Sequence, residues 1–130
     1  MRKALVTGAS TGIGRTVAVE LSKNGFSVFL VARNQRALEE TKEIIAKGNA
    51  NAYVLQADLG TVDGINKLIS DISKLNIHID LLANIAGIWH GEKDVYAGKE
   101  LQSFDQKVIL DTFTVGTIAP MLLVHGLLAQ

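Results

Sequence analysis

Cysteine is absent from this chain of 130 residues, and proline, aromatic side chains and net charge are scarce. Without cysteine there is no disulfide framework, no thiolate chemistry and no Cys-ligated metal. Lys plus Arg and Asp plus Glu each number 13, so no overall field attracts nucleic acid or an anionic membrane. Aromatic residues make up 5%, too few for platforms on which bases stack. What the sequence does contain is 12 glycines, and their placement carries most of the information.

Long apolar runs are also missing. The N-terminus offers only the apolar segment Ala4–Val6, which is too short for a signal peptide. The apolar stretch Thr112–Val124 is interrupted by Gly116 and Pro120, whereas a membrane helix needs roughly 18 or more apolar residues. We therefore expect a buried helix at this position and a soluble, cytoplasmic protein with no membrane partner.

Short apolar runs alternate with segments of helical periodicity. Apolar residues recur at helical spacing at Ile65, Leu68 and Ile72, and Asn34 and Thr61 can each cap a helix. Four apolar runs predict β-strands: Lys3–Val6, Ser27–Ala32, Ala52–Gln56 and Ile79–Asn84. The alternation predicts an α/β protein with a Rossmann-type, doubly wound parallel sheet and helices on both faces.

The expected strand order fixes where a ligand would bind. Strands joined by helices are expected to have right-handed crossovers, and a classical doubly wound sheet places four of them in the order 3-2-1-4, with the first and fourth strands side by side. Ligands of such sheets bind at the carboxyl ends of the strands, where the order reverses. A helix over Arg15–Asn24 is expected to follow the first strand. The end of the sequence predicts a polar connection over Trp89–Ser103 and a helix over Phe104–Leu128 that Pro120 bends.

Three glycines, Gly8, Gly12 and Gly14, separate the first strand from the following helix. One glycine can allow a tight reversal, one can let a phosphate approach the backbone, and one can let the helix pack closely on the strand. The amides at the helix N-terminus would then favour an anion. The order of residues excludes a P-loop, because no Gly-Lys-Ser/Thr follows at the required distance. A βα turn without a ligand and a methyltransferase-type loop remain as alternatives.

Three segments together resemble one family. The turn Thr7–Gly14 reads TGASTGIG and resembles the TGxxxGIG turn of short-chain dehydrogenases/reductases. Asp58-Leu59 resembles the family's acidic position beside the adenine ring. Asn84–Gly87 resembles the family's NNAG motif, with Ile85 in place of the second Asn. The motifs occur in the family's order and spacing, so residues 1–130 are similar to the N-terminal, NAD(P)-binding portion of a member of that family.

The resemblance implies a set of site residues. They run from the pyrophosphate to the adenine and then to the nicotinamide ribose: Gly8, Ser10, Thr11, Gly12, Ile13, Gly14, Asp58, Leu59, Asn84, Ala86 and Gly87. It also implies hydride transfer between a nicotinamide and a small carbonyl or alcohol substrate.

The end of the second strand predicts which cofactor is bound. An acidic side chain there would bind the ribose hydroxyls of NAD and repel a 2′-phosphate. The strand instead ends Ala32-Arg33-Asn34, and a guanidinium grips a phosphate through paired donors. We therefore expect NADP(H) in preference to NAD(H), with Arg33 on the 2′-phosphate. The alternative is a solvated Arg33 at the end of a strand.

No catalytic residue is predicted within these 130 residues. Members of the family use a Ser and a YxxxK pair, and the sequence ends at Gln130 before either would appear. Tyr96 and Lys99 have the wrong spacing, and Tyr53 lacks a lysine partner, so we expect it in the core. Trp89 could line the substrate entrance. We expect the 130 residues to be an incomplete stretch of a longer enzyme.

The long helix lacks an asparagine that members of the family use in a proton relay. This position aligns with Gly116 or, in another register, with Asp111, which puts an Asn-dependent proton relay in doubt. His78, His90 and His125 share no metal-ligand spacing, so we predict no metal.

The resemblance also implies partners. The helix that begins near Phe104 would lie at a subunit interface in a homodimer or homotetramer. A non-catalytic dinucleotide-binding or sensing module is the alternative function, and no nucleic-acid partner is expected.

Overall fold

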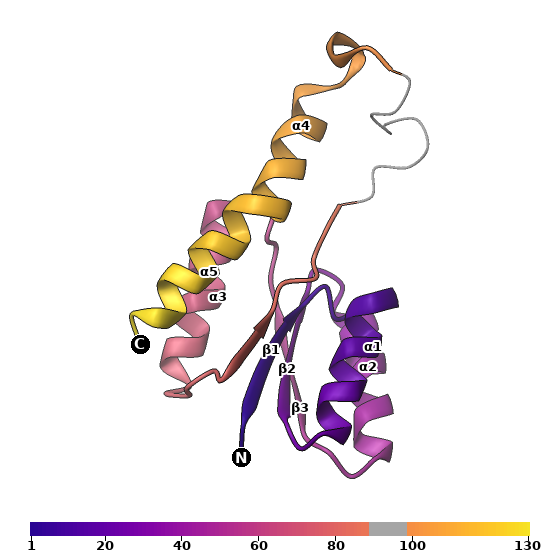
Figure 1. The fold of residues 1–130 in the computed structure, drawn as a ribbon, viewed down its shortest axis with the longest axis vertical. Coiled ribbons are helices and arrows are strands. Elements are labelled where there is room, and N and C mark those ends of the chain that lie inside the picture. Colours follow the sequence, from indigo (N-terminus) through magenta and orange to yellow (C-terminus); the bar gives the residue numbers. More distant parts are fainter. Residues whose placement is uncertain (89–98) are drawn as a thin grey trace.

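A computed structural model describes residues 1–88 and 99–130 of the chain. Its centre is a parallel sheet of four strands in the order β3-β2-β1-β4. The strands are β1 (Lys3–Thr7), β2 (Ser27–Ala32), β3 (Ala52–Gln56) and β4 (Leu81–Ala83). Helices cover both faces, so the predicted Rossmann-type fold and strand order are confirmed (Figure 1).

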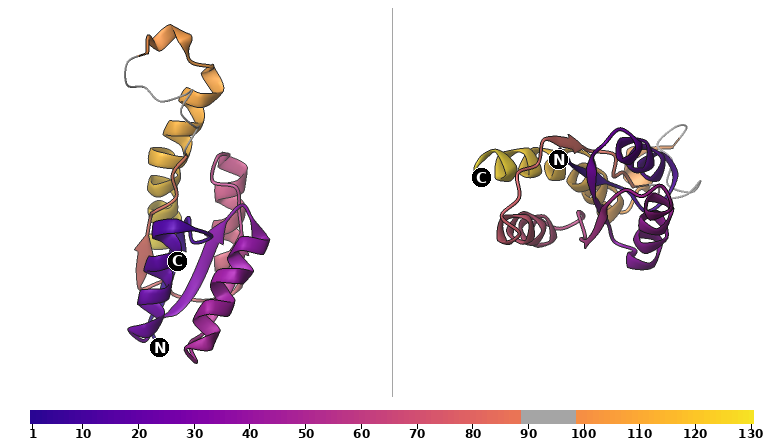
Figure 2. Two further views of the ribbon diagram at one scale, coloured as in Figure 1. Left: turned by 90° about the vertical axis from the view of Figure 1, so that its right-hand side faces the viewer. Right: turned by 90° about the horizontal axis from the view of Figure 1, so that it is seen from below.

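The helices form two layers, one on each side of the sheet (Figures 1 and 2). Helices α1 (Gly12–Lys23) and α2 (Gln35–Lys47) cover one face. Helices α3 (Val62–Lys74) and α5 (Ala119–Leu128) cover the other, and α4 (Gln106–Phe113) extends beyond the sheet.

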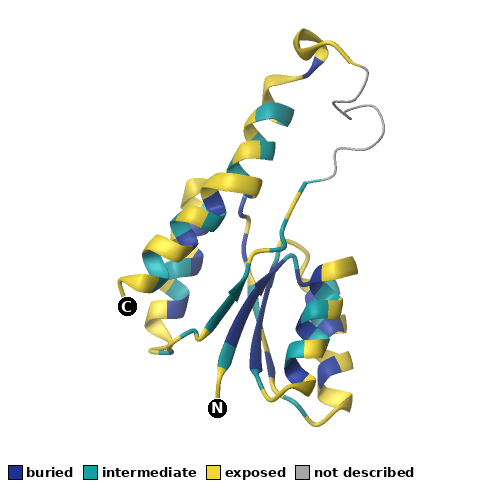
Figure 3. Ribbon diagram, in the orientation of Figure 1, coloured by how far each residue is buried: buried dark blue, intermediate teal, exposed yellow. Residues whose placement is uncertain are grey.

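Alternate residues of the central strands supply two separate apolar cores. Leu5 and Phe29 pack toward α3 and α5, whereas Val6 and Leu30 pack toward α1 and α2. Both inner strands are therefore buried along most of their length (Figure 3), as expected for parallel strands covered on both faces.

The predicted N-caps are confirmed. The Asn34 side chain accepts a hydrogen bond from the Ala37 amide at 3.1 Å, and the Thr61 hydroxyl accepts one from the Gly64 amide at 3.0 Å. Each satisfies an amide that the first helical turn leaves without a backbone partner. Asn34 thus starts α2 directly after β2, which holds Arg33 at the carboxyl edge of the sheet.

Two boundaries differ from the sequence prediction. Helix α1 begins at Gly12 and not at Arg15, because the first amides of a helix need no intrahelical partner and glycine is tolerated there. Strand β4 is shorter than predicted. Asp80, the residue before β4, makes two hydrogen bonds to the backbone of Lys3. Its carboxylate accepts from the Lys3 amide at 2.7 Å, and its own amide donates to the Lys3 carbonyl at 2.9 Å.

The prediction that Tyr53 belongs to the core is wrong, because this side chain is 48% exposed. Tyr53 lies in β3, which has a neighbouring strand on one side only. Its ring stacks on Phe29 with centroids 4.9 Å apart, so one face of the ring is covered and the other is open.

The final helical segment departs from two predictions. Its irregularity is a π-helical turn over Thr114–Ile118, whereas Pro120 lies in the first turn of α5, where a missing amide proton is tolerated. The expectation of a buried helix is also wrong. Residues Gln106–Leu128 are long and apolar enough to cross a membrane by length and composition, and 17% of the most apolar window is buried. Core helices of soluble proteins can be equally long and apolar, so length and composition do not distinguish a membrane helix from a core helix.

The inner side of α5 lies very close to α3 at Gly126. A Cβ at Gly126 would lie 2.6 Å from Cδ1 and 2.8 Å from Cγ2 of Ile69 in α3. Gly126→Ala should therefore destabilise the protein by about 1–3 kcal/mol through overpacking. The control is Gly116→Ala, whose Cβ meets nothing within 4 Å. Urea denaturation should give a lower midpoint for Gly126→Ala than for the control, and equal midpoints would contradict this packing.

Candidate functional site

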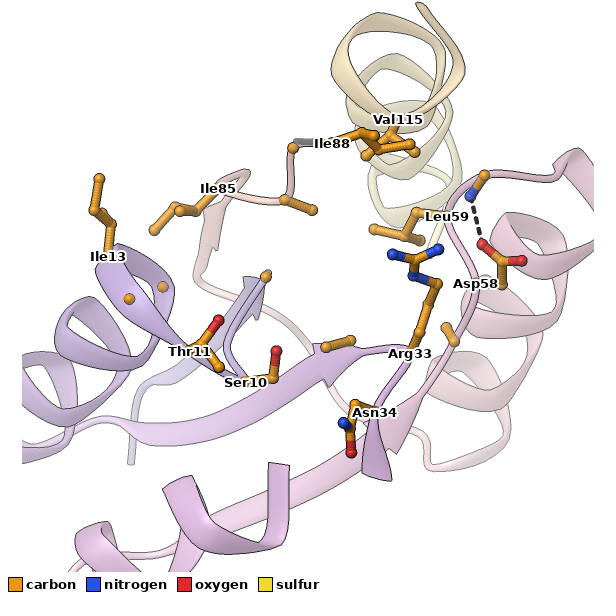
Figure 4. Close-up of a pocket in the computed structure, with 18 residues that line it drawn as sticks. Ser10, Thr11, Ile13, Arg33, Asn34, Asp58, Leu59, Ile85, Ile88 and Val115 are labelled. Atoms are coloured by element: carbon orange, nitrogen blue, oxygen red, sulfur yellow. Dashed lines mark hydrogen bonds between the residues drawn. The ribbon is translucent and has the colours of Figure 1, made fainter. Parts of the chain in front are cut away.

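A cavity of about 660 Å³ lies at the carboxyl ends of the strands, where the strand order reverses between β1 and β4 (Figure 4). All of the predicted site residues except Asn84 line it. They are Gly8, Ser10, Thr11, Gly12, Ile13, Gly14, Arg33, Asp58, Leu59, Ala86 and Gly87. Asn84 is exposed just after β4 and is not part of the lining.

Two glycines of the turn allow backbone segments to approach closely. Gly8 has φ of +69°, and a Cβ there would lie 2.9 Å from the Cα and amide nitrogen of Ala86. A Cβ at Gly14 would lie 1.9 Å from the carbonyl oxygen of Gly8. A side chain at either position would therefore collide with backbone, which cannot move aside as the end of a flexible side chain could. These contacts hold the turn against both α1 and the segment after β4.

Thr7 links the two sides of the switch point through its buried hydroxyl. The oxygen accepts hydrogen bonds from the amides of Ile85 at 3.0 Å and Ala86 at 3.1 Å. The hydroxyl proton points toward the Ala83 carbonyl, 3.5 Å away. One side chain thus sets the backbone path immediately after β4, where Ala86 and Gly87 border the cavity.

The N-terminus of α1 faces the cavity without a protein cap. Thr11 occupies the N-cap position but makes no side-chain cap hydrogen bond, and the first turn contains no acidic residue. Ile13, in that turn, is 75% exposed at the cavity edge. Amides at a helix N-terminus carry partial positive charge, so this edge can bind an anionic group.

Among the residues that the structure describes, Arg33 is the one cation that borders the cavity, at the end of β2. Figure 4 shows Arg33 extending from this strand end toward Leu59. Its carbonyl accepts a hydrogen bond from Gln56 Nε2 at 2.8 Å, which ties the ends of β2 and β3 together. Among the ion pairs of residues 1–88 and 99–130 none involves Arg33, whereas Arg36 lies 3.8 Å from a Glu40 oxygen.

The far wall comes from the loop after β3. Asp58 Oδ1 accepts a hydrogen bond from the Gly60 amide at 2.8 Å, which fixes the carboxylate at the cavity edge (Figure 4). Leu59 is 5% exposed and belongs to the core shared with α3 and α5. The wall is therefore anchored by packing on one side and by an Asx-type turn on the other.

Some lining residues were not predicted from the sequence. Ala57 and Gly60 flank Asp58 and could have been found from that neighbour alone. Ile88 and Val115 carry no local signal. Val115 reaches the cavity from the π-helical turn between α4 and α5, so only the tertiary fold brings it there.

The described lining is suited to binding and lacks a proton-transfer pair. Arg33 and Asp58 are its only ionisable side chains among the residues that the structure describes. Gly116 lies next to Val115 and is exposed, while Asp111 forms an ion pair with Lys107 on α4. No group of three His, Asp or Glu that could hold a metal occurs in the described part of the chain. Trp89, His90 and Tyr96 lie outside the described residues.

Comparison with known proteins defines the family. The short chain dehydrogenase model matches residues 2–130. A very-long-chain 3-oxooacyl-CoA reductase of Caenorhabditis briggsae is 33% identical over 98% of this chain, a match that covers 40% of that relative. A fatty acyl-CoA reductase of Acinetobacter baylyi is 42% identical over 65% of this chain and 28% of the relative. The chain therefore belongs to the short-chain dehydrogenase family, and it spans less than half the length of these two relatives.

A solved structure of a short-chain oxidoreductase has the same fold. The crystal structure of a metagenomic short-chain oxidoreductase in complex with NADP has a TM-score of 0.87 and 27% sequence identity. The alignment covers 98% of this chain and 55% of the other. Family and fold together favour a dehydrogenase-type glycine turn over the methyltransferase-type alternative.

The Thr7 contacts predict a measurable effect. Thr7→Val should lower the free energy of unfolding by about 1–3 kcal/mol, because two backbone amides lose their acceptor. Amide hydrogen exchange at Ile85 and Ala86 should become faster. Thr7→Ser keeps the hydroxyl and should retain most of the protection. Unchanged exchange at both amides in Thr7→Val would contradict the role assigned to Thr7.

Proposed function

We propose that residues 1–130 form a single NAD(P)-binding unit that holds NADP(H) in the 660 Å³ cavity. The unit would serve a short-chain oxidoreductase acting on a small carbonyl or alcohol substrate. The observation that carries the proposal is Arg33, a cation with no ion-pair partner in the described residues, at the strand end where an NAD-selecting acid is missing. The metagenomic relative in complex with NADP supports the same choice of cofactor.

The residues present fit the charge of such a cofactor. The uncapped amides at the start of α1 would stabilise the pyrophosphate, and Gly8, Gly12 and Gly14 leave room for it beside the backbone. Arg33 would pair with the 2′-phosphate through two parallel N–H donors. The nicotinamide, when bound, would give a hydride to a carbonyl or accept one from an alcohol.

The two ends of the cofactor would meet different walls. Asp58 uses Oδ1 on the Gly60 amide, and its other oxygen can accept from an adenine amino group beside Leu59. Asn84, Ala86 and Gly87 would flank the nicotinamide ribose at the end of β4. Of these, Ala86 is fixed through Thr7.

A non-catalytic dinucleotide-binding or sensing module is the second candidate. It is favoured by the absence of a Tyr, Lys or His from the cavity lining in the described part of the chain. Oxidation of bound NADPH by the full-length protein with a panel of carbonyl substrates separates the two. Turnover supports the oxidoreductase, whereas tight binding without turnover supports the module.

Arg33→Ala tests the cofactor assignment. The substitution should weaken NADPH binding by about 1–3 kcal/mol, the cost of losing a charge-assisted contact, and leave NADH binding nearly unchanged. Arg36→Ala is the matched control, because Arg36 is exposed on α2 and does not line the cavity. Isothermal titration of both cofactors gives the comparison. Equal losses for NADPH and NADH would overturn the assignment of Arg33 to the 2′-phosphate.

We also propose that the outer side of the final helical segment is a subunit interface of a homodimer or homotetramer. Only its inner side packs on α3, through Leu123 and Gly126. Large apolar side chains are exposed on the rest of the segment: Leu110, Phe113, Ile118, Met121, Val124 and Leu128. Several large apolar side chains exposed along one helical segment are typical of an interaction site.

Met121→Glu should convert the oligomer to smaller species, because a charge would be buried without a partner. Light scattering after gel filtration measures the mass of the full-length protein. Gln106→Glu, at the exposed start of α4, is the control and should leave the oligomer intact. A wild-type protein that is monomeric, or that sediments with lipid vesicles, would contradict the proposed interface.

A further inference from the structure

Arg15 directs its side chain toward α2 and does not line the cavity. Its Nε donates to the Thr41 hydroxyl at 2.9 Å. Its Nη2 lies 2.5 Å from the Ser10 carbonyl oxygen and 3.2 Å from that of Ala37. One guanidinium therefore joins the glycine turn to α2.

Thr41 completes the link from within the protein. It occupies a position on the apolar stripe of α2 between Leu38 and Ile45 and is fully buried. Its hydroxyl accepts from Arg15, and its one proton is shared between the carbonyls of Ala9 at 2.9 Å and Ala37 at 3.1 Å. Valine has nearly the same shape, so packing alone does not require threonine here. The hydroxyl is needed by the polar groups around it, because a buried polar group is costly unless it is hydrogen-bonded.

These contacts set the orientation of two peptide groups. The carbonyls of Ala9 and Ser10 point toward Thr41 and Arg15. In a planar trans peptide the N–H points opposite to the C=O, and the chain contains no cis peptide among the described residues. The amides of Ser10 and Thr11 therefore point away from α2, on the side where these residues border the cavity. Two N–H groups pointing the same way form an anion-binding concavity.

The same link fixes the position of the cation. Arg33 immediately precedes Asn34, the N-cap of α2, and Arg15 contacts Ala37 in the first turn of that helix. The glycine turn and the Arg33 segment are thus held as one unit. Figure 4 shows Ser10 and Thr11 on one side of the cavity, and Arg33 and Asn34 on the adjacent side.

We propose that Arg15 and Thr41 are positioning residues for the corner formed by Ser10, Thr11 and Arg33, and that they contribute to the selection of NADPH over NADH. This inference rests on the proposed function of the cavity. It assigns Arg15 a role through the backbone of the glycine turn, because its guanidinium is hydrogen-bonded within the protein.

The first test is Thr41→Val in the full-length protein, which removes the hydroxyl with little change in shape. We expect the Kd for NADPH to rise about tenfold, the size of effect typical of a lost hydrogen bond to a charged network. The Kd for NADH should rise less than about threefold, because NADH lacks the 2′-phosphate and so does not depend on Arg33 being held against the turn. A merely structural role would lower the melting temperature and raise both Kd values equally.

Two further variants keep the proposal testable if Thr41→Val fails to fold. Thr41→Ser retains the hydroxyl and should restore the NADPH preference. Arg15→Lys retains the charge but loses the planar fork, so it should shift the preference as Thr41→Val does. Arg36→Lys is the matched Arg-to-Lys control, because Arg36 is exposed on α2 and contacts neither Thr41 nor Ser10, and it should leave both Kd values unchanged.

The outcomes separate this inference from the function on which it rests. A wild-type protein that binds neither NADPH nor NADH overturns the proposed function, and this inference with it. A wild-type protein that prefers NADPH, with the same preference in Thr41→Val and Arg15→Lys, overturns only the role of these two residues. A loss confined to NADPH in both variants supports it.

Discussion

The closeness of backbone segments around the first turn determines the rest of the site. Gly8 lies against Ala86, and Gly14 lies against Gly8, at distances that admit no Cβ. These contacts join β1, α1 and the segment after β4. The same contacts therefore hold β1 beside β4 and shape the cavity between their ends. The hydroxyl of Thr7 adds the hydrogen bonds that hold this arrangement. Missing side chains are thus as important here as the ones present.

The electrostatics of the cavity follow from the same arrangement. The helix N-terminus and the turn supply N–H groups, which carry partial positive charge without titrating. Asp58 has one carboxylate oxygen occupied by the Gly60 amide, and it lies on the far wall after β3. Arg33 therefore supplies the full positive charge of the described lining, at the end of β2. The 2′-phosphate of the proposed NADP(H) ligand has the complementary charge. The polar link through Thr41 explains how a turn with little side-chain volume keeps its amides oriented.

Local patterns predicted what depends on local periodicity. The strands, the apolar stripes of α2 and α3 and the caps at Asn34 and Thr61 were predictable, because each depends on residues close in sequence. Arg33 could be assigned to the site from its place at the end of β2, whereas Asp58 was assigned through the family resemblance. The environment of Tyr53 could not be predicted, because its exposure depends on β3 being an edge strand. Val115 likewise reaches the cavity only through the tertiary fold.

The final helical segment illustrates why hydrophobicity alone does not predict environment. Its length and composition would allow it to cross a membrane, and a core helix of a soluble protein can have the same properties. In the structure, one side of the segment packs on α3 and the sheet, and the other side is exposed. The small residues Ala119 and Gly126 allow α5 to approach the sheet and α3 closely, so a narrow stripe satisfies that packing. The larger apolar residues, among them Phe113 and Met121, remain outside this stripe. The close contact on the inner side uses small residues, and the large apolar side chains are left on the exposed side of the segment.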